Sequence, residues 1–322
     1  MGFSQERIST LVFYRIVKKE CRLGVDQGSS ARMSDGKKTQ TGPSTGDHNR
    51  DHQITNMSII TPFITSLISG LYTSLWGAFK DSPYEGFKPK TFPRSVYFHI
   101  AIFLPLYFVP YFSVRSQHLG LVQVFFLIMG IERFLAEIYK GFFRTEDQQK
   151  YFVPSRITFF GRHVESDLLR YVVGTVIIAI VFAFLLVELP MMSFWAYLVT
   201  AYGTGCIVAL GGAYKDAPFE GFQLLKFQRS GLVLAVLSPL FYFLGDPEHP
   251  VALGFLIYMN GGLERCSVEY YKTYIQRNMS GKFQPGLPRI QQMLDSREKF
   301  HYLALVIIGG LAVLYTYELG AL

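Results

Sequence analysis

The sequence predicts an all-α polytopic membrane protein of about eight transmembrane helices, built from two tandem parallel four-helix repeats. Half of the 322 residues are hydrophobic and only 17% are charged, a composition typical of membrane proteins. The apolar residues gather in runs of about 20, the length that crosses a hydrocarbon layer of about 30 Å. In addition, one polar stretch occurs twice in the chain.

The repeated stretch runs from Gly77 to Ser95 and recurs, 135 residues later, from Gly212 to Ser230. Of its 19 positions 11 are identical, and many identities fall on Lys, Asp, Pro, Glu, Gly and Arg, not on the abundant apolar residues. A second match, at an offset of 132, joins the Gly-Ile-Glu-Arg that begins at Gly130 with a Gly-Leu-Glu-Arg further on. Matches of this kind indicate an internal duplication.

Three segments follow from this pattern. Residues 1–56 are polar and rich in Ser, Gly, Asp and Thr, so we expect a disordered tail. The sequence leaves open whether this tail belongs to the mature protein. The first membrane repeat is expected over residues 57–188 and the second over residues 189–322.

Each repeat contains four apolar runs. Because four is an even number, both copies must enter the membrane in the same direction, which places the axis between them along the membrane normal. A turn at Glu188-Leu-Pro190 separates the last run of one copy from the first run of the next. The expected spans lie near residues 58–79, 95–114, 118–139, 167–188, 191–212, 231–245, 251–270 and 301–319.

The basic residues give the expected orientation and partners. The net charge is +7, but the basic residues lie mainly in loops between apolar runs, so we expect the lipid bilayer and not nucleic acid as the partner. The loops at one end of the spans carry most of the Lys and Arg, whereas the short turns opposite carry only Arg115. The positive-inside rule therefore predicts that the loops with the repeated Lys-Asp pair are cytoplasmic.

The repeated stretch supplies the first candidate site. We expect Pro83 to start a turn that Gly86 ends, with the charged side chains gathered at the membrane surface. Such a mixed cluster is suited to binding a small ion or a lipid headgroup, and the alternative is a purely structural role at the interface. The candidates are Lys80, Asp81, Glu85 and Arg94 in the first copy, and Lys215, Asp216, Glu220 and Arg229 in the second.

A second set of charges lies inside the expected third span of each copy: Glu132, Arg133 and Glu137, and Glu264, Arg265 and Glu269. Each arginine precedes a glutamate by four residues, so we expect pairing along one helix face. Charges at this depth must be paired or hydrated, so they should face the interior of the bundle. They either line a substrate path or form a salt bridge that holds the third span to the first or second span of the same copy.

Several kinds of site are not expected. The chain has no Walker loop, nucleophile elbow, HExxH motif or dinucleotide fingerprint, and we expect no cofactor. The three cysteines show no metal-site spacing and predict no structural disulfide. A histidine metal site is not expected either, because these histidines seem unshared between the copies at the offsets of 132 and 135: His99, His118, His163, His249 and His301.

Three functions fit this pattern. The first is a carrier or channel for a small solute, ion or lipid. The second is a membrane-embedded enzyme acting on a phosphorylated lipid headgroup at the cytoplasmic face, and the third is a non-catalytic membrane subunit. Both copies keep the same charges, although an enzyme needs only one active site, and this favours transport.

Overall fold

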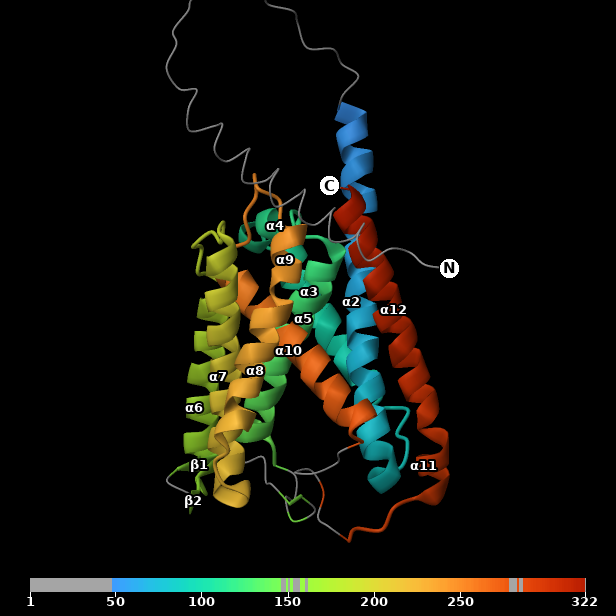
Figure 1. The fold of residues 1–322 in the computed structure, drawn as a ribbon, viewed down its shortest axis with the longest axis vertical. Coiled ribbons are helices and arrows are strands. Elements are labelled where there is room, and N and C mark those ends of the chain that lie inside the picture. The colour runs from blue at the N-terminus through green and yellow to red at the C-terminus, as the bar shows by residue number, and fades with distance from the viewer. Residues whose placement is uncertain are drawn as a thin grey trace, which may run out of the picture. The chain divides into compact units, whose positions relative to one another are not determined.

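The computed structural model describes residues 48–145, 149, 151–152, 157–159, 162–277, 283 and 286–321. Nearly all of its regular structure is helical (Figure 1). Residues 1–47 of the predicted tail lie outside the described part of the chain, whereas residues 48–56 are helical and open α2.

The first half of the chain contains α2 (His48–Glu85), α3 (Arg94–Phe108), α4 (Pro110–Ser116), α5 (Leu121–Ile138), the π-helix η1 (Tyr139–Phe143), β1 (Thr158–Phe159), β2 (Arg162–His163) and α6 (Asp167–Phe184). The two short strands pair antiparallel, with Thr158 opposite His163. The second half contains α7 (Phe194–Glu220), α8 (Leu224–Leu237), α9 (Pro239–Leu244), α10 (Leu253–Tyr270), the π-helix η2 (Tyr271–Ile275), α11 (Gln291–Ser296) and α12 (Glu298–Ala321).

Five helical segments are long and apolar enough to cross a membrane. A sixth crossing results if α3 and α4, which meet at an angle of 96°, are counted as one broken span. Several helices thus fit an integral membrane protein. The five segments are Ile59–Glu85, Asp167–Phe184, Phe194–Tyr214, Phe227–Leu244 and Gln291–Gly320.

The expected spans at 118–139 and 251–270 correspond to α5 and α10, which do not qualify on composition. Each of these helices has 18 residues and carries three charged side chains, too many for a lipid-exposed span. They are also among the most buried parts of the protein. Charge and burial agree here, because a helix surrounded by other helices is shielded from the hydrocarbon.

The expected span at 95–114 is bent. Val109 adopts an extended backbone (ψ 119°) between α3 and α4, and Pro110 follows it at the start of α4. A proline disfavours helical geometry in the residue before it, which accounts for the break. As a result α4 includes Val114, where the sequence had indicated the start of a turn.

The two central helices, α5 and α10, cross in backbone contact (Figure 1). A Cβ atom on Gly130 would lie 1.8 Å from the carbonyl oxygen of Tyr258, and one on Gly262 would lie 2.0 Å from that of Phe126. Only glycine fits at either position. Close approach through small residues is a common way for membrane helices to pack.

Buried hydroxyl groups join α2 to the centre. The hydroxyl of Ser69 donates to the carbonyl oxygen of Phe125 on α5 at 2.9 Å, and that of Ser66 donates to the carbonyl oxygen of His99 on α3 at 3.2 Å. By contrast, α6, α7 and α12 present exposed apolar side chains such as Val176, Val199 and Val306. A polar interior and an apolar exterior are what a bilayer requires.

Candidate functional site

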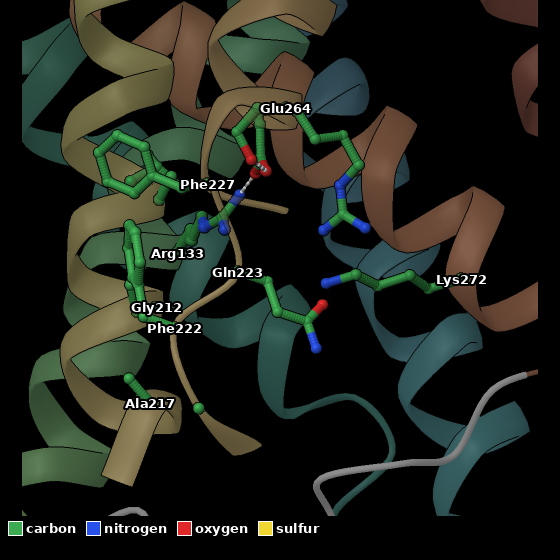
Figure 2. A pocket seen from close by; sticks show the side chains of 14 residues that line it. Arg133, Gly212, Ala217, Phe222, Gln223, Phe227, Glu264 and Lys272 are labelled. Carbon is green, nitrogen blue, oxygen red and sulfur yellow. Dashed lines mark hydrogen bonds and ion pairs between the residues drawn. The ribbon is translucent and has the colours of Figure 1, made fainter. Parts of the chain in front are cut away.

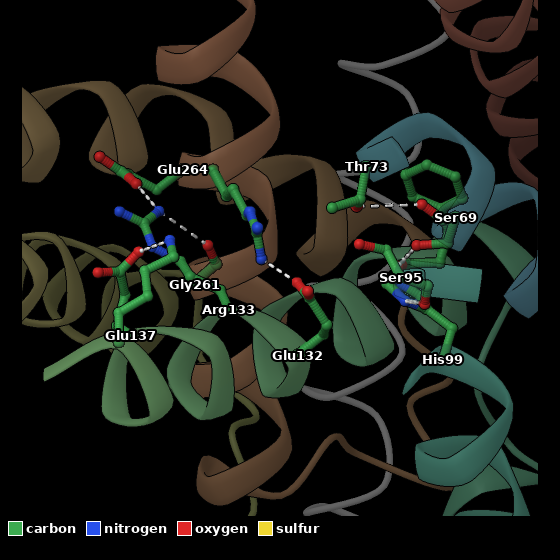
Figure 3. Close-up of polar contacts among 12 residues, drawn as sticks. Ser69, Thr73, Ser95, His99, Glu132, Arg133, Glu137, Gly261 and Glu264 are labelled. Carbon is green, nitrogen blue, oxygen red and sulfur yellow. Dashed lines mark hydrogen bonds and ion pairs between the residues drawn. The ribbon is translucent and has the colours of Figure 1, made fainter. Parts of the chain in front are cut away.

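Two ion pairs join α5 and α10 just beyond their crossing. Arg133 on α5 donates to Glu264 on α10, and Arg265 on α10 donates to Glu132 on α5 (Figure 3). The side chains of Glu132 and Glu264 are only 6% and 3% exposed. Each half of the protein therefore supplies the acid that binds the arginine of the other half.

This arrangement differs from the predicted pairing along each helix and from a lock within one copy. The crossing at Gly130 and Gly262 explains the difference, because it brings the residues two and three positions later within reach of the opposite helix. Glu269, one of the predicted partners, instead binds Lys80 at 3.2 Å and Lys272 at 3.7 Å.

In the first half the space around the ion pair is filled by Trp76. The guanidinium of Arg265 lies 5.1 Å from the centre of an indole ring, and the ammonium of Lys80 lies 5.2 Å from it on the same residue. Both distances are suited to cation–π attraction. We call this arrangement of Trp76, Lys80, Glu132, Arg265 and Glu269 the closed cluster.

In the second half a cavity of about 100 Å³ lies beside the ion pair of Arg133 and Glu264 (Figure 2). This volume holds several water molecules. Its charged and polar lining comes from α5, α8, α10 and η2 and the turn before α8, while the small residues of α7 form one wall. We call it the open cavity, and its polar lining residues are Arg133, Gln223, Arg229, Ser230, Glu264 and Lys272.

One sequence difference accounts for the contrast between the halves. The position 135 residues after Trp76 is Gly211, and Gly212 follows it on α7. A Cβ atom on either glycine would have no neighbour within 4 Å, so this part of α7 borders open space. The indole that fills the closed cluster has no counterpart here.

The open cavity carries more positive than negative charge. Its described lining contains three cationic side chains and one carboxylate, Glu264, which already accepts from Arg133 and, at 2.7 Å, from the hydroxyl of Ser230. Arg229 makes no hydrogen bond or ion pair within the described part of the chain, and its Nε atom is buried without a partner. Arg229 is therefore the cation with the most unused hydrogen-bonding capacity.

The first copy of the repeated stretch does not form the predicted cluster. The helix α2 continues through Pro83 to Glu85, so no turn starts at this proline, and Gly86 ends the helix at a positive φ of 73° as predicted. Lys80 points to the centre and binds Glu269, whereas Glu85 binds Lys88 at 3.0 Å.

The remaining predicted residues divide into three groups. Asp81 lies in the last turns of α2, exposed Arg94 begins α3, and Glu137 binds Lys140 at 2.8 Å. Arg229 lines the open cavity. The side chains of Lys215, Asp216 and Glu220 lie outside the described part of the structure, although their backbone forms the last turns of α7.

At the opposite ends of α5 and α10, His118 and His249 stack with ring centres 3.7 Å apart. They border a cavity of about 350 Å³ together with Arg115, Glu188 and Glu248. The expectation that no histidine has a counterpart is therefore wrong at this point. The two residues are 131 positions apart, so a length difference of one residue between the turns hid the match.

The hydrogen bond from the ring of His249, at 2.9 Å, holds the pKa of the Asp246 carboxyl below its ordinary value. Within the described residues, no group of three or more His, Cys, Asp or Glu is arranged to hold a metal ion. The stacked histidines thus form an interhelical contact at the turns.

Sequence reasoning missed Trp76, Gly211 and Lys272 as parts of the site. Comparison of the copies had concentrated on the residues that they share, whereas the cavity results from a position at which they differ. The change from Trp to Gly within an otherwise similar stretch was the available signal. Comparison with protein family models, curated proteins and solved structures found no match.

Proposed function

We propose that the protein is an integral membrane carrier for a small solute, ion or lipid, and that its substrate site lies beside the crossing of α5 and α10. The observation that carries this proposal is the open cavity, which reaches the buried pair of Arg133 and Glu264. Charges inside a membrane protein cost several kcal/mol unless paired or hydrated, and they commonly mark substrate and ion pathways.

The proposal includes an internal duplication of the fold. In support, α5 and α10 have the same length, and each continues directly into a five-residue π-helix. The π-helix is rare in proteins and often lies at functional sites, so its presence at two equivalent positions is unlikely to arise from unrelated sequences. Gly221 also ends α7 at a positive φ of 76°, as Gly86 ends α2.

Equivalent helix contacts give further support. A Cβ atom on Gly70 of α2 would lie 2.6 Å from the Cα atom of Val96 on α3. A Cβ atom on Gly205 of α7 would lie 2.6 Å from the Cα atom of Gly231 on α8. Both members of this second contact are displaced by 135 residues from the first.

We further propose that α5 and α10 are interior spans, which with the five apolar segments and the bent pair α3–α4 gives eight crossings. The chain path in Figure 1 supports this reading, because successive long helices alternate in direction and α5 and α10 descend in the same direction. Their charges are paired with each other, which lowers the cost of placing them in the membrane. The positive-inside rule then makes the Lys-Asp loops cytoplasmic.

A membrane-embedded enzyme acting on a phosphorylated lipid headgroup is the second candidate. The three cations of the open cavity favour it, because they suit a phosphate group. However, the only carboxylate in the described lining is Glu264, which is already bound by Arg133 and Ser230 and is poorly placed to accept a proton from a substrate. We therefore prefer the carrier.

Purified full-length protein in proteoliposomes tests the proposal. We expect uptake of at least one labelled solute from a panel of phosphate, sulfate, chloride, sodium and glycerol, or movement of a fluorescent phospholipid between leaflets, above the rate in protein-free vesicles. Gly211→Trp, which fills the cavity, should abolish this flux, whereas Gly77→Leu in the other half should retain it.

Gly77 is a suitable control because a Cβ atom there has no neighbour within 4 Å. A folded protein that moves none of these solutes and no lipid would contradict the carrier and favour a non-catalytic subunit. Product formation from a phosphorylated lipid without flux would favour the enzyme.

A further inference from the structure

We infer that the open cavity binds a phosphate-type oxyanion, either free or as the headgroup of a lipid, through Arg229, Lys272 and Arg133. The inference deepens the proposed function by naming the chemistry of the substrate, and it rests on that proposal for the role of the site. It concerns one half of the protein only, because Trp76 occupies the equivalent space in the other half.

Charge is the first argument. The described lining has three cations against one carboxylate, so an anion of charge −2 would balance it. Glu264 cannot neutralise more than one of these cations and already binds Arg133. Lys272 lies 3.7 Å from Glu269, but this acid is shared with Lys80, which is closer to it at 3.2 Å. An excess of buried positive charge is costly without a counterion.

Hydrogen bonding is the second argument. The guanidinium of Arg229 has no partner within the described residues, and its Nε–H is buried. Buried polar groups in native proteins are nearly always satisfied, so an unpaired donor that borders a cavity indicates a missing acceptor. Arginine presents its donors in a planar fork that matches two oxygens of phosphate, whereas lysine acts as a compact point charge.

The shape of the cavity limits what can enter. One wall consists of Gly212, Ala213 and Ala217 on α7, which project little side chain, while the rings of Phe222 and Phe227 border the other side (Figure 2). A volume of about 100 Å³ admits a small tetrahedral group but no bulky ligand. The body of a lipid would have to remain outside, with only its phosphate inserted.

The other half of the protein supplies matched controls. Arg94 is the counterpart of Arg229 and is exposed at the start of α3. Lys140 is the counterpart of Lys272 and binds Glu137. Neither residue lines the open cavity. A specific site must therefore respond to one member of each pair and not to the other.

The experiment measures binding of inorganic phosphate, sulfate, chloride and a short-chain phosphatidic acid to the purified full-length protein in detergent, by isothermal titration calorimetry and by the shift in Tm. We expect phosphate or phosphatidic acid to bind and raise Tm. Arg229→Gln and Lys272→Gln should each weaken this binding at least about tenfold, whereas Arg94→Gln and Lys140→Gln should leave it unchanged. Arg229→Lys should give an intermediate affinity, because it keeps the charge and loses the fork.

Several results would overturn the inference: no binding of either phosphate ligand to the folded protein, equal binding of chloride, or equal losses in Arg94→Gln and Arg229→Gln. Binding of phosphatidic acid but not phosphate identifies the lipid headgroup, and the reverse identifies the free ion. If Arg229→Gln does not fold, Gly211→Trp replaces it, with loss of binding expected. Binding without flux contradicts the carrier alone, whereas flux without anion binding contradicts this inference alone.

Discussion

The closed cluster and the open cavity contain the same Glu-Arg combination in different surroundings. In the closed cluster Arg265 and Glu132 are 7% and 6% exposed, and the indole of Trp76 lies against the arginine. In the open cavity Glu264 is 3% exposed, but Arg133 is 19% exposed because Gly211 leaves space beside it. One side chain thus decides whether a buried ion pair is only structural or can be reached by a ligand.

This contrast also explains how both copies can keep their charges while only one has a cavity. The ion pairs are exchanged between the helices, so each copy needs the acid of the other copy to neutralise its own arginine. Loss of a charge in either copy would leave a buried partner unpaired, which is strongly destabilising. Retention of the charges is therefore accounted for by stability, independently of transport.

The largest expected effect comes from removing the crossing on which both sites depend. Gly130→Ala and Gly262→Ala place a methyl group within about 2 Å of a carbonyl oxygen of the facing helix, so the helices must separate. We expect a loss of more than about 4 kcal/mol in the free energy of unfolding, or failure to fold. Thermal unfolding in detergent measures it, with Gly212→Ala as the control. Near-native stability of both variants would contradict the close crossing.

The next effect distinguishes the two ion pairs. Arg265→Gln leaves Glu132 buried beside Trp76 without its cation and should cost about 3–5 kcal/mol. Arg133→Gln should cost less, about 1–2 kcal/mol, because Glu264 keeps the hydrogen bond from Ser230 and borders the cavity. Chemical unfolding of both variants gives the comparison, and equal losses would show that the cavity does not hydrate the pair.

A second substitution checks that the loss comes from an unpaired acid. Adding Glu132→Gln to Arg265→Gln should recover part of the stability, since the buried charge is then removed. The same acid substitution combined with Arg133→Gln should give no such recovery. Rescue of Arg133→Gln by Glu132→Gln would instead indicate pairing along α5.

Exchanging the residues that distinguish the halves should have a smaller effect on stability. Trp76→Gly removes a large side chain from the closed cluster and should cost about 2–3 kcal/mol, less than for a fully buried tryptophan. Gly211→Trp should cost less than about 1 kcal/mol, because the new side chain enters open space. Tm values measure both. A large loss in Gly211→Trp would mean that the space is needed for packing.

The smallest effect is expected at the other end of the central helices, where Asp246 binds His249 and the equivalent position near His118 is Arg115. The lowered pKa of Asp246 means that its contribution to stability is present above its ordinary value of 3.8 and is lost as the pH falls through the lower folded value. Because the pair is exposed and screened, we expect well under 1 kcal/mol.

Unfolding of Asp246→Asn and the unchanged protein between about pH 2 and 7 measures this contribution. The difference between them should be greatest near neutral pH and should vanish at the acid end. A difference that grows as the pH falls would have the wrong sign for this hydrogen bond. Glu248→Gln, which leaves this side-chain pair intact, serves as the control.

The sequence alone predicted the all-helical character, the presence of several membrane-spanning helices and the buried position of Glu132 and Glu264. Apolar runs of sufficient length and charges repeated within them contain this information, because the cost of placing polar groups in hydrocarbon acts on each helix separately. The helix end at Gly86 was likewise a local property of glycine. The bend at Val109 could have been read from Pro110.

Only the tertiary structure decided which charges are partners. Along a helix the nearest acid to Arg133 is four residues away, but Gly130 and Gly262 let two helices meet backbone to backbone, and the facing helix then supplies a closer one. Likewise Lys80 leaves its own repeated stretch for Glu269, 189 residues away. Pairing, and the open space left by Gly211, depend on the distance between helices, which no periodicity within a single helix determines.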